Sequence, residues 1–202
     1  MVVEIPTLHG PARVHLRPAP AARGAIVLGH GAGGSVGARD LLAAAEAAGS
    51  LGLTVALVEQ PYRVAGRRSP APVHQLDAAW VEAVDHLALA GAPLVVGGRS
   101  SGARVACRTA AAVGADAVLC LAFPLLPPPR QGRQPASSRL PELDAVGLPT
   151  LVVQGEHDRF GIPPEAPRRT VAVVRGDHAL RSDLETISDA VRTWLSTLLD
   201  AR

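Results

Sequence analysis

Three features of the sequence predict an α/β fold, with a mostly parallel sheet of roughly eight strands and helices on both faces. Short apolar, β-branched runs alternate with longer alanine-rich segments along the chain. This alternation is typical of parallel sheets, whose connecting helices cover both faces. Several apolar runs end in glycine-rich turns, where ligands bind in such sheets. With 202 residues and no boundary in its composition, the chain is expected to form a single domain, residues 1–202, without a separate cap.

The first half of the chain supplies four strands and two helices. A Gly-Pro turn separates the two opening strands, and two glycines end the first alanine-rich helix. The second helix has apolar residues at spacings of three and four, which predicts one buried face. The expected strands are Val2–Ile5, Arg13–Leu16, Ala25–Leu28 and Thr54–Val58, and the helices run from about Ala38 to Ala48 and from Pro72 to Ala90.

The second half continues the alternation and then interrupts it. A fully apolar strand is followed by Gly98–Gly102 and a helix to about Val113, whereas residues 123–149 are rich in Pro and Arg. We expect that stretch to be mainly a surface loop with a short helical piece at Leu140–Val146. The remaining expected elements are strands at Pro93–Gly97, Ala117–Ala122, Thr150–Gln154 and Thr170–Val174 and an amphipathic closing helix at Leu184–Leu199.

The composition excludes several functions. All 20 basic residues are Arg, so no Lys can form a Schiff base or complete a Walker A phosphate loop. The net charge of +2 and the scattered Arg residues argue against nucleic acid as a partner. No apolar run reaches the length of a membrane span, and we expect a cytoplasmic protein. The two cysteines, Cys107 and Cys120, lie in apolar runs and are expected to be buried and reduced.

A G-x-S-x-G sequence, Gly98–Gly102, lies between an apolar strand and a helix. Such a strand-to-helix turn is tight enough to require glycine two residues to either side, and it exposes the middle serine above the sheet. The spacing selects Ser100, because Ser101 has Arg99 and Ala103 at those positions. We therefore expect Ser100 to be a nucleophile.

Serine needs an imidazole to take its proton and a carboxylate to orient that imidazole. Asp158 follows one expected strand, in Gln154-Gly-Glu-His-Asp, and His178 follows the next, in Arg175-Gly-Asp-His. The order Ser, Asp, His is the one found in α/β-hydrolases. The sequence thus predicts Ser100, Asp158 and His178 as catalytic residues.

A fourth glycine-rich turn, His30-Gly-Ala-Gly-Gly34, follows the third expected strand. Acyl transfer needs backbone N–H donors opposite the nucleophile to bind the developing oxyanion. Ser101, directly after the nucleophile, is expected to supply one N–H. Ala32 is expected to supply the second, with Gly33 as the near alternative.

Together these stretches resemble a small, capless α/β-hydrolase of the dienelactone-hydrolase-like kind. The chain is more specifically similar to the family that includes testis-expressed protein thirty and the third subunit of the nonspecific-lethal chromatin complex. The stretches that carry this resemblance are His30–Gly34, Pro61–Arg63 with Ala65–Arg68, Gly97–Gly102, Phe123–Pro128 and Gln154–Asp158 with Phe160-Gly161. The resemblance implies Ser100 as nucleophile, Asp158 as acid and His178 as base. It implies a reaction class and no particular substrate.

Neighbouring polar residues offer rival assignments. His157 lies on the loop of the expected acid, Asp177 is the immediate neighbour of His178, and His30 is expected to brace the oxyanion loop by hydrogen bonding. Arg63, Arg99 and Arg159 flank the expected site. Each is either a solvated residue or a ligand for a substrate carboxylate.

Two other functions use the same residues. Gly29, Gly31 and Gly34 also fit the G-x-G-x-x-G of a Rossmann dinucleotide binder, with Glu59 as its ribose-binding acid. A non-catalytic interaction module with Pro124–Arg139 as its contact surface is the third possibility. The hydrolase interpretation uses all four glycine-rich or acidic turns. It predicts a small-molecule substrate, an ester-like bond and no metal or organic cofactor, and it leaves the oligomeric state open.

Overall fold

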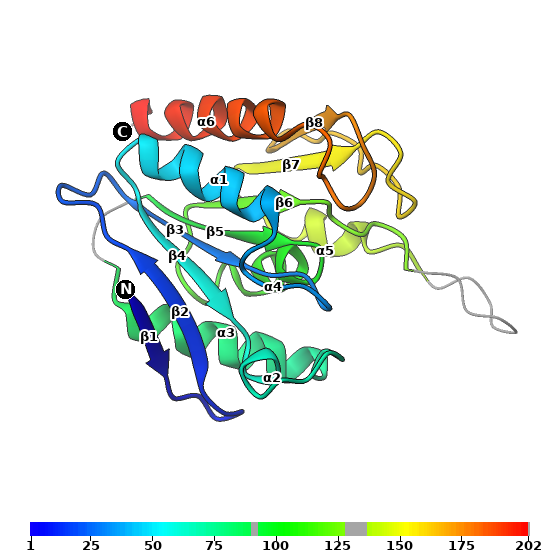
Figure 1. Ribbon diagram of the computed structural model, residues 1–202. Helices are drawn as coiled ribbons and strands as arrows, with labels where there is room; N and C mark the ends of the chain where they lie inside the picture. The colour runs from blue at the N-terminus through cyan, green and yellow to red at the C-terminus, as the bar shows by residue number, and fades with distance from the viewer. Residues whose placement is uncertain (90–92, 128–136, 202) are drawn as a thin grey trace, which may run out of the picture.

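Eight strands form one continuous sheet in the computed structural model, which describes residues 1–89, 93–127 and 137–201 (Figure 1). The strand order is β1-β2-β4-β3-β5-β6-β7-β8. The pairs β1–β2 and β2–β4 are antiparallel, and the other neighbours are parallel. The strands are β1 (Val2–Ile5), β2 (Ala12–Arg17), β3 (Ala25–Gly29), β4 (Thr54–Glu59), β5 (Leu94–Arg99), β6 (Ala117–Leu121), β7 (Thr150–Gly155) and β8 (Arg169–Val174).

Helices cover both faces of the sheet. Figure 1 shows α1 and α6 side by side on one face, while α3 and α4 pack on the other with α5 beside α4. The helices are α1 (Arg39–Ser50), α2 (Pro61–Val64), α3 (Val73–Leu87), α4 (Ser101–Thr109), α5 (Leu140–Asp144) and α6 (Leu184–Asp200). In the described parts of the chain, none of the connections builds a separate lid over the strand ends.

The sheet separates two apolar layers. Along β3, Val27 points into the layer with α3 and α4, whereas Ile26 and Leu28 point into the layer with α1 and α6. All five residues of β3 are buried, as expected for a central parallel strand covered on both sides. The parallel strands are therefore fixed in register, and their carboxyl ends meet at one edge.

The elements differ from the expected ones mainly at helix ends. The short helix α2 lies where the sequence predicts a loop, and it begins with Pro61 at its first position. Helix α3 ends at Leu87, because Ala88 adopts a left-handed conformation with φ of 42°. Helix α4 ends at Thr109 rather than near Val113. The end expected for the α3 helix, Ala90, and residues 128–136 of the Pro- and Arg-rich segment lie outside the described residues.

None of the helices in the described ranges is both long and apolar enough to cross a lipid bilayer.

Candidate active site

Ser100 occupies a strained turn between β5 and α4. Its φ is 52° and its ψ is −107°, a conformation that costs a non-glycine residue about 1–3 kcal/mol. The backbone N–H of Ser100 donates to the carbonyl oxygen of Leu121 at 2.9 Å, which fixes the turn against β6. The strain is held by the packed sheet around it, and it places the serine side chain at the carboxyl edge of the strands.

The flanking glycines allow α4 to approach β3 closely. A Cβ atom on Gly98 or on Gly102 would collide with the carbonyl oxygen of Gly29, at the end of β3. A Cβ on Gly102 would also lie 2.8 Å from the carbonyl oxygen of His30. The two glycines therefore bring the turn next to the His30–Gly34 loop.

Asp158, His178 and Ser100 form one chain of hydrogen bonds. Nδ1 of His178 lies 2.7 Å from Oδ2 of Asp158, and Nε2 of His178 lies 3.0 Å from Oγ of Ser100. The three side chains come from the loops that follow β7, β8 and β5. An ionised carboxylate only accepts, so Nδ1 carries the proton and Nε2 is left to accept from the serine hydroxyl. This arrangement can withdraw a proton from Ser100.

Asp158 is fixed by donors on both of its oxygens. The backbone N–H of Phe160 donates to Oδ1 at 2.8 Å, and Nε2 of Gln154 donates to Oδ2 at 2.7 Å. The Asp158 side chain is completely buried, so these bonds replace the solvation that it loses. The ring of Phe160 packs edge-on against His178 with centroids 4.5 Å apart. Both the carboxylate and the imidazole are thus held in one orientation.

The His30–Gly34 loop is braced from behind by α2. Nε2 of the buried His30 accepts from the backbone N–H of Gln60 at 3.1 Å, and Nδ1 donates to the carbonyl oxygen of Gly31 at 2.8 Å. Burial lowers the pKa of His30, which keeps its ring neutral and able to accept. The hydroxyl of Tyr62 donates to the carbonyl oxygen of Ala32 at 2.7 Å.

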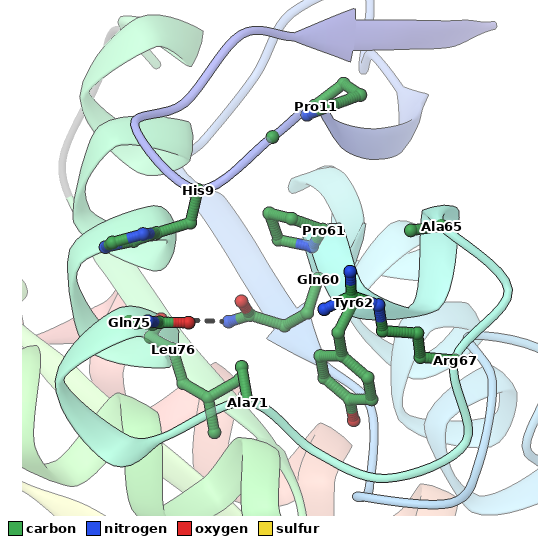
Figure 2. A pocket seen from close by; sticks show the side chains of 11 residues that line it. His9, Pro11, Gln60, Pro61, Tyr62, Ala65, Arg67, Ala71, Gln75 and Leu76 are labelled. Atoms are coloured by element: carbon green, nitrogen blue, oxygen red, sulfur yellow. Dashed lines mark hydrogen bonds between the residues drawn. The ribbon is translucent and has the colours of Figure 1, made fainter.

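Gln60 and Tyr62 also line a small cavity of about 100 Å³ behind this loop, which Figure 2 shows. Nε2 of Gln60 donates to the carbonyl oxygen of Leu76 at 3.1 Å, the dashed line in Figure 2. That bond ties the start of α2 to α3. The loop beside Ser100 is therefore anchored to the body of the protein.

A buried ion pair supports the His178 loop. Nε of Arg99 lies 2.8 Å from Oδ2 of Asp40, whose side chain is 1% exposed, and Nη2 of Arg99 donates to the carbonyl oxygen of His178 at 2.7 Å. Burial raises the pKa of Asp40, and the Arg99 charge opposes that rise. Arg99 thereby joins α1 to the loop that carries the imidazole.

These groups surround a cavity of about 390 Å³. The oxyanion candidates Ala32, Gly33 and Ser101 line it together with Ser100 and His178. No protein acceptor in the described part of the chain takes the N–H of Ala32 or that of Ser101. Both amides are thus available to a bound oxygen atom. The other lining residues are Pro70, Arg99, Arg104, Pro124, Arg139, Arg159 and Phe160.

The comparisons with known proteins agree with this fold. Residues 22–186 match the family model described as Alpha/beta hydrolase domain. The chain belongs to the alpha/beta hydrolase family. The expected fold class, an eight-stranded and mostly parallel hydrolase sheet without a cap, is confirmed. A search of curated proteins found no match.

Several solved structures are similar to this alpha/beta hydrolase along nearly the whole chain. XC6422 from Xanthomonas campestris, a serine hydrolase without a lid, is 18% identical with a TM-score of 0.74, over 98% of this chain and 94% of that one. A dienelactone hydrolase from Anabaena variabilis is 18% identical with a TM-score of 0.74, over 98% of this chain and 97% of that one. Est1E from Butyrivibrio proteoclasticus is 14% identical with a TM-score of 0.78, over 100% of this chain and 99% of that one. At these identities the similarity establishes the fold.

The three flanking arginines of this hydrolase have different surroundings. Arg159 lines the cavity and lies over the Phe160 ring, 4.9 Å from its centroid. Arg99 lines it too, but two of its nitrogens contact Asp40 and the His178 carbonyl group. Arg63 lies on α2 outside the cavity lining, and its Nη1 donates to the carbonyl oxygen of Arg67 at 3.0 Å.

The rival residues lie apart from the hydrogen-bonded chain. The side chain of His157 is 80% exposed, and Oδ1 of Asp177 accepts from the backbone N–H of Ala179. His30 braces the oxyanion loop as expected. Cys107 and Cys120 are buried, with sulfur atoms 3.5 Å apart.

Four further residues belong to this site and were not predicted from the sequence: Gln154, Asp40, Arg104 and Arg139. Gln154 ends a strand four residues before Asp158, so its place in the motif was a usable signal. Asp40 is far from Ser100 in sequence, and no local pattern pairs it with Arg99. Among the described residues, no group of three or more His, Cys, Asp or Glu side chains is arranged to hold a metal ion.

Proposed function

We propose that this alpha/beta hydrolase cleaves an ester-like bond of a small molecule, in an ester, thioester or lactone, through an acyl-enzyme on Ser100. The observation that carries the proposal is the continuous hydrogen-bonded chain from Asp158 through His178 to Ser100. A serine in a strained turn, in contact with an oriented imidazole and beside a cavity, has what nucleophilic catalysis requires.

In the proposed reaction, Nε2 of His178 takes the hydroxyl proton as Oγ of Ser100 attacks the carbonyl carbon. Asp158 stabilises the imidazolium that forms. The imidazolium then protonates the leaving oxygen or sulfur, which releases the first product or, in a lactone, opens the ring. A water molecule, deprotonated by the same imidazole, attacks the acyl-enzyme; the imidazolium returns this proton to Oγ of Ser100 as the acid product leaves. The reaction needs no metal or organic cofactor.

The N–H groups of Ser101 and Ala32 are proposed to bind the oxyanion in both steps. Ser101 also begins α4, so the positive end of the helix dipole adds to its donor. The short helix α2 supports the loop that carries the second donor through the Tyr62 hydroxyl. The Tyr62 bond to the Ala32 carbonyl oxygen fixes the N–H of Gly33 in the same planar peptide unit, and the His30 bond to the Gly31 carbonyl oxygen fixes the N–H of Ala32 in the same way.

The segments Gln60–Ser69, Phe123–Leu140 and Arg159–Pro167 are proposed to select the substrate.

We also propose that the protein belongs to the narrower family of testis-expressed protein thirty and that it is cytoplasmic. The dinucleotide alternative requires Gly29, Gly31 and Gly34 in a Rossmann sheet, whose strands are mostly parallel in the order 3-2-1-4-5-6. Two antiparallel neighbours at β2 favour the hydrolase instead.

Labelling with a fluorophosphonate tests the proposal, since the reagent reacts with activated serines. Wild type is expected to be labelled on Ser100, and Ser100→Ala and His178→Ala to lose the label. Ser50→Ala, at the exposed end of α1, and His157→Ala, with its exposed ring, are matched controls that should keep it. Absence of labelling in folded wild-type protein would contradict the proposal. Stabilisation by NAD would then favour the dinucleotide binder, and no stabilisation would favour the interaction module.

A further inference from the structure

The cavity beside Ser100 has a strongly cationic wall. Among the residues that the structure describes, four arginines line it, and no Asp or Glu does. Arg99 and Arg104 come from the Ser100 turn and α4, whereas Arg139 and Arg159 come from the loops before α5 and after β7. A site for a neutral substrate has no need of four guanidinium groups around it. Their individual partners decide which of them are available to a ligand.

Two of the four are neutralised by the protein. Arg99 pairs with the buried Asp40, as described above. Nε of Arg104 donates to Oε2 of Glu142 at 2.8 Å, and its Nη2 contacts the other oxygen of the same carboxylate. Glu142 also pairs with Arg108 at 3.5 Å. Both arginines therefore stabilise the fold, and the carboxylates of Asp40 and Glu142 compensate most of their positive charge.

The charges of Arg139 and Arg159 are compensated less directly. In the described ranges of the chain, neither forms an ion pair with a carboxylate. Nη1 of Arg139 donates to the carbonyl oxygen of Pro124 at 3.0 Å. Burial is the main cause that lowers the pKa of Arg139; the nearby charges of Arg104 and Arg108 lower it further, and that of Glu142 opposes the shift. A half-buried cation among other cations is stabilised by an anion.

Backbone hydrogen bonds hold these two arginines around the same segment. The N–H of Arg139 donates to the carbonyl oxygen of Leu125 at 2.8 Å, and the N–H of Leu126 donates to the carbonyl oxygen of Phe160 at 2.8 Å. Arg159 is the neighbour of Phe160 and lies over its ring. The Phe160 ring also packs against the ring of His178. Arg139 is half-buried at the cavity, whereas Arg159 is exposed and its guanidinium group lies against the Phe160 ring.

We propose that Arg139 and Arg159 form an anion subsite that selects acyl compounds carrying a carboxylate or phosphate group remote from the bond that is cleaved. The inference rests on the proposed hydrolase function and specifies its substrate class. The planar guanidinium fork matches the oxygen pairs of both anions, and a partly enclosed site strengthens the interaction. The neutral lining residues Pro70, Pro124 and Phe160 leave room for the rest of the acyl group.

Matched esters separate charge from size. One is the 4-nitrophenyl ester of succinic acid with its second carboxylate free, and the other is the ester of succinamic acid, which replaces that carboxylate with a neutral amide. Wild type is expected to favour the charged ester about 10- to 100-fold in kcat/KM, the range of one or two charge-assisted hydrogen bonds. Most of the preference should lie in KM, and it should shrink as salt concentration rises.

Arg139→Gln and Arg159→Gln are each expected to lose about tenfold of that preference. The readout is the ratio of kcat/KM for the two esters, because any effect of the substitution on the reaction that both esters share cancels in that ratio. Arg139→Lys and Arg159→Lys should recover part of the preference, because they restore the charge without the fork. Arg192→Gln is the control, since Arg192 lies on α6 and pairs with Asp189 at 2.6 Å.

Failure of the subsite and failure of the proposed function have different signatures. Equal kcat/KM for the two esters in a protein that fluorophosphonate labels on Ser100 would overturn the subsite and leave the hydrolase function intact. If neither ester is cleaved and Ser100 is not labelled, the proposed function fails, and calorimetric titration with monomethyl succinate decides the subsite alone. Binding that both glutamine variants abolish would support it, and no binding to wild type would overturn it.

Discussion

The Tyr62 hydroxyl donates a 2.7 Å hydrogen bond to the carbonyl oxygen of Ala32, and so connects α2 to the loop beside Ser100. Burial raises the pKa of Tyr62 to about 12, so the hydroxyl stays protonated and can donate throughout the neutral range. The ring lies edge-on to His30, with centroids 5.8 Å apart, and His30 braces the same loop. The shape of the proposed oxyanion site therefore depends on a helix that is only four residues long.

Tyr62→Phe is expected to lower kcat about tenfold with little change in KM. The substitution keeps the buried ring but removes one hydrogen bond, worth about 0.5–1.5 kcal/mol, from the loop that positions the Ala32 amide. Steady-state hydrolysis of a neutral 4-nitrophenyl ester measures the effect, and circular dichroism checks that the variant is folded. A kcat equal to that of wild type would show that Tyr62 does not position the oxyanion donors.

Gln154→Leu is expected to lower both stability and activity. Its Nε2 donates to Asp158 and to the carbonyl oxygens of Phe123 and Gly161. Losing these donors leaves buried acceptors unsatisfied, at a cost of about 1–3 kcal/mol in the free energy of unfolding. Urea unfolding measures that cost, and kcat should fall as Asp158 loses its orientation. Gln75→Leu, on the half-buried start of α3, is the control and should change neither quantity much.

The positions of the strands and of most helices along the chain could be predicted because each buried element has its own local pattern. The apolar run of β3 predicts a central strand wherever the rest of the sheet lies. Helix α2 was not predicted: Pro61–Val64 is too short to show a helical period. Helix α3 ends because Ala88 adopts a left-handed conformation, and no glycine stands at that position to signal the end in the sequence.

The candidate site was predictable where its residues belong to motifs and not where they act through distant contacts. Ser100, Asp158 and His178 each follow a strand, so the fold itself implies that they meet at one edge. Whether they catalyse a reaction stays a prediction. The pairing of Arg99 with Asp40 depends on how α1 packs against the sheet, and such packing has no signal in a single sequence.

Removing Arg99 should cost more stability than removing it together with its partner. Arg99→Met leaves the carboxylate of Asp40 buried without a counter-charge, which costs about 3 kcal/mol in the free energy of unfolding. In the double variant with Asp40→Asn, that penalty should largely disappear. Urea unfolding of the wild type, both single variants and the double variant gives the coupling energy, expected at about 1–3 kcal/mol. Strict additivity would mean that the two side chains do not stabilise each other.

Gly102→Ala is expected to destabilise the protein by about 3 kcal/mol or to prevent folding. The added methyl group would meet the carbonyl groups of Gly29 and His30, and backbone atoms cannot move aside as a flexible side chain does. Gly37→Ala is the matched control, because its Cβ would only touch Ser35 at an ordinary 3.5 Å. Thermal unfolding compares the two, and equal melting temperatures would show that the close approach of α4 to β3 is not required.

The neutral ring of His30 should make stability depend on pH below 6.5. Burial is the main cause of its lowered pKa; the Arg63 charge lowers it further, and Glu59 and the Gly31 hydrogen bond oppose the shift. The unfolded chain therefore binds a proton at a higher pH than the folded chain does. The neutral His30 ring contributes fully to stability above the ordinary histidine pKa of 6.5, and this contribution is lost as the pH falls toward the lower pKa of His30 in the folded chain.

The free energy of unfolding is expected to change with pH by at most about 1.4 kcal/mol per pH unit through His30 alone. His30→Gln should be less stable than wild type at pH 8, and the difference should narrow at pH 5, because glutamine binds no proton in either state. Urea unfolding across this range measures both curves. His157→Gln, which removes an exposed imidazole, should run parallel to wild type. If the His30→Gln and wild-type curves are parallel as well, the His30 ring does not titrate differently in the folded and unfolded chains.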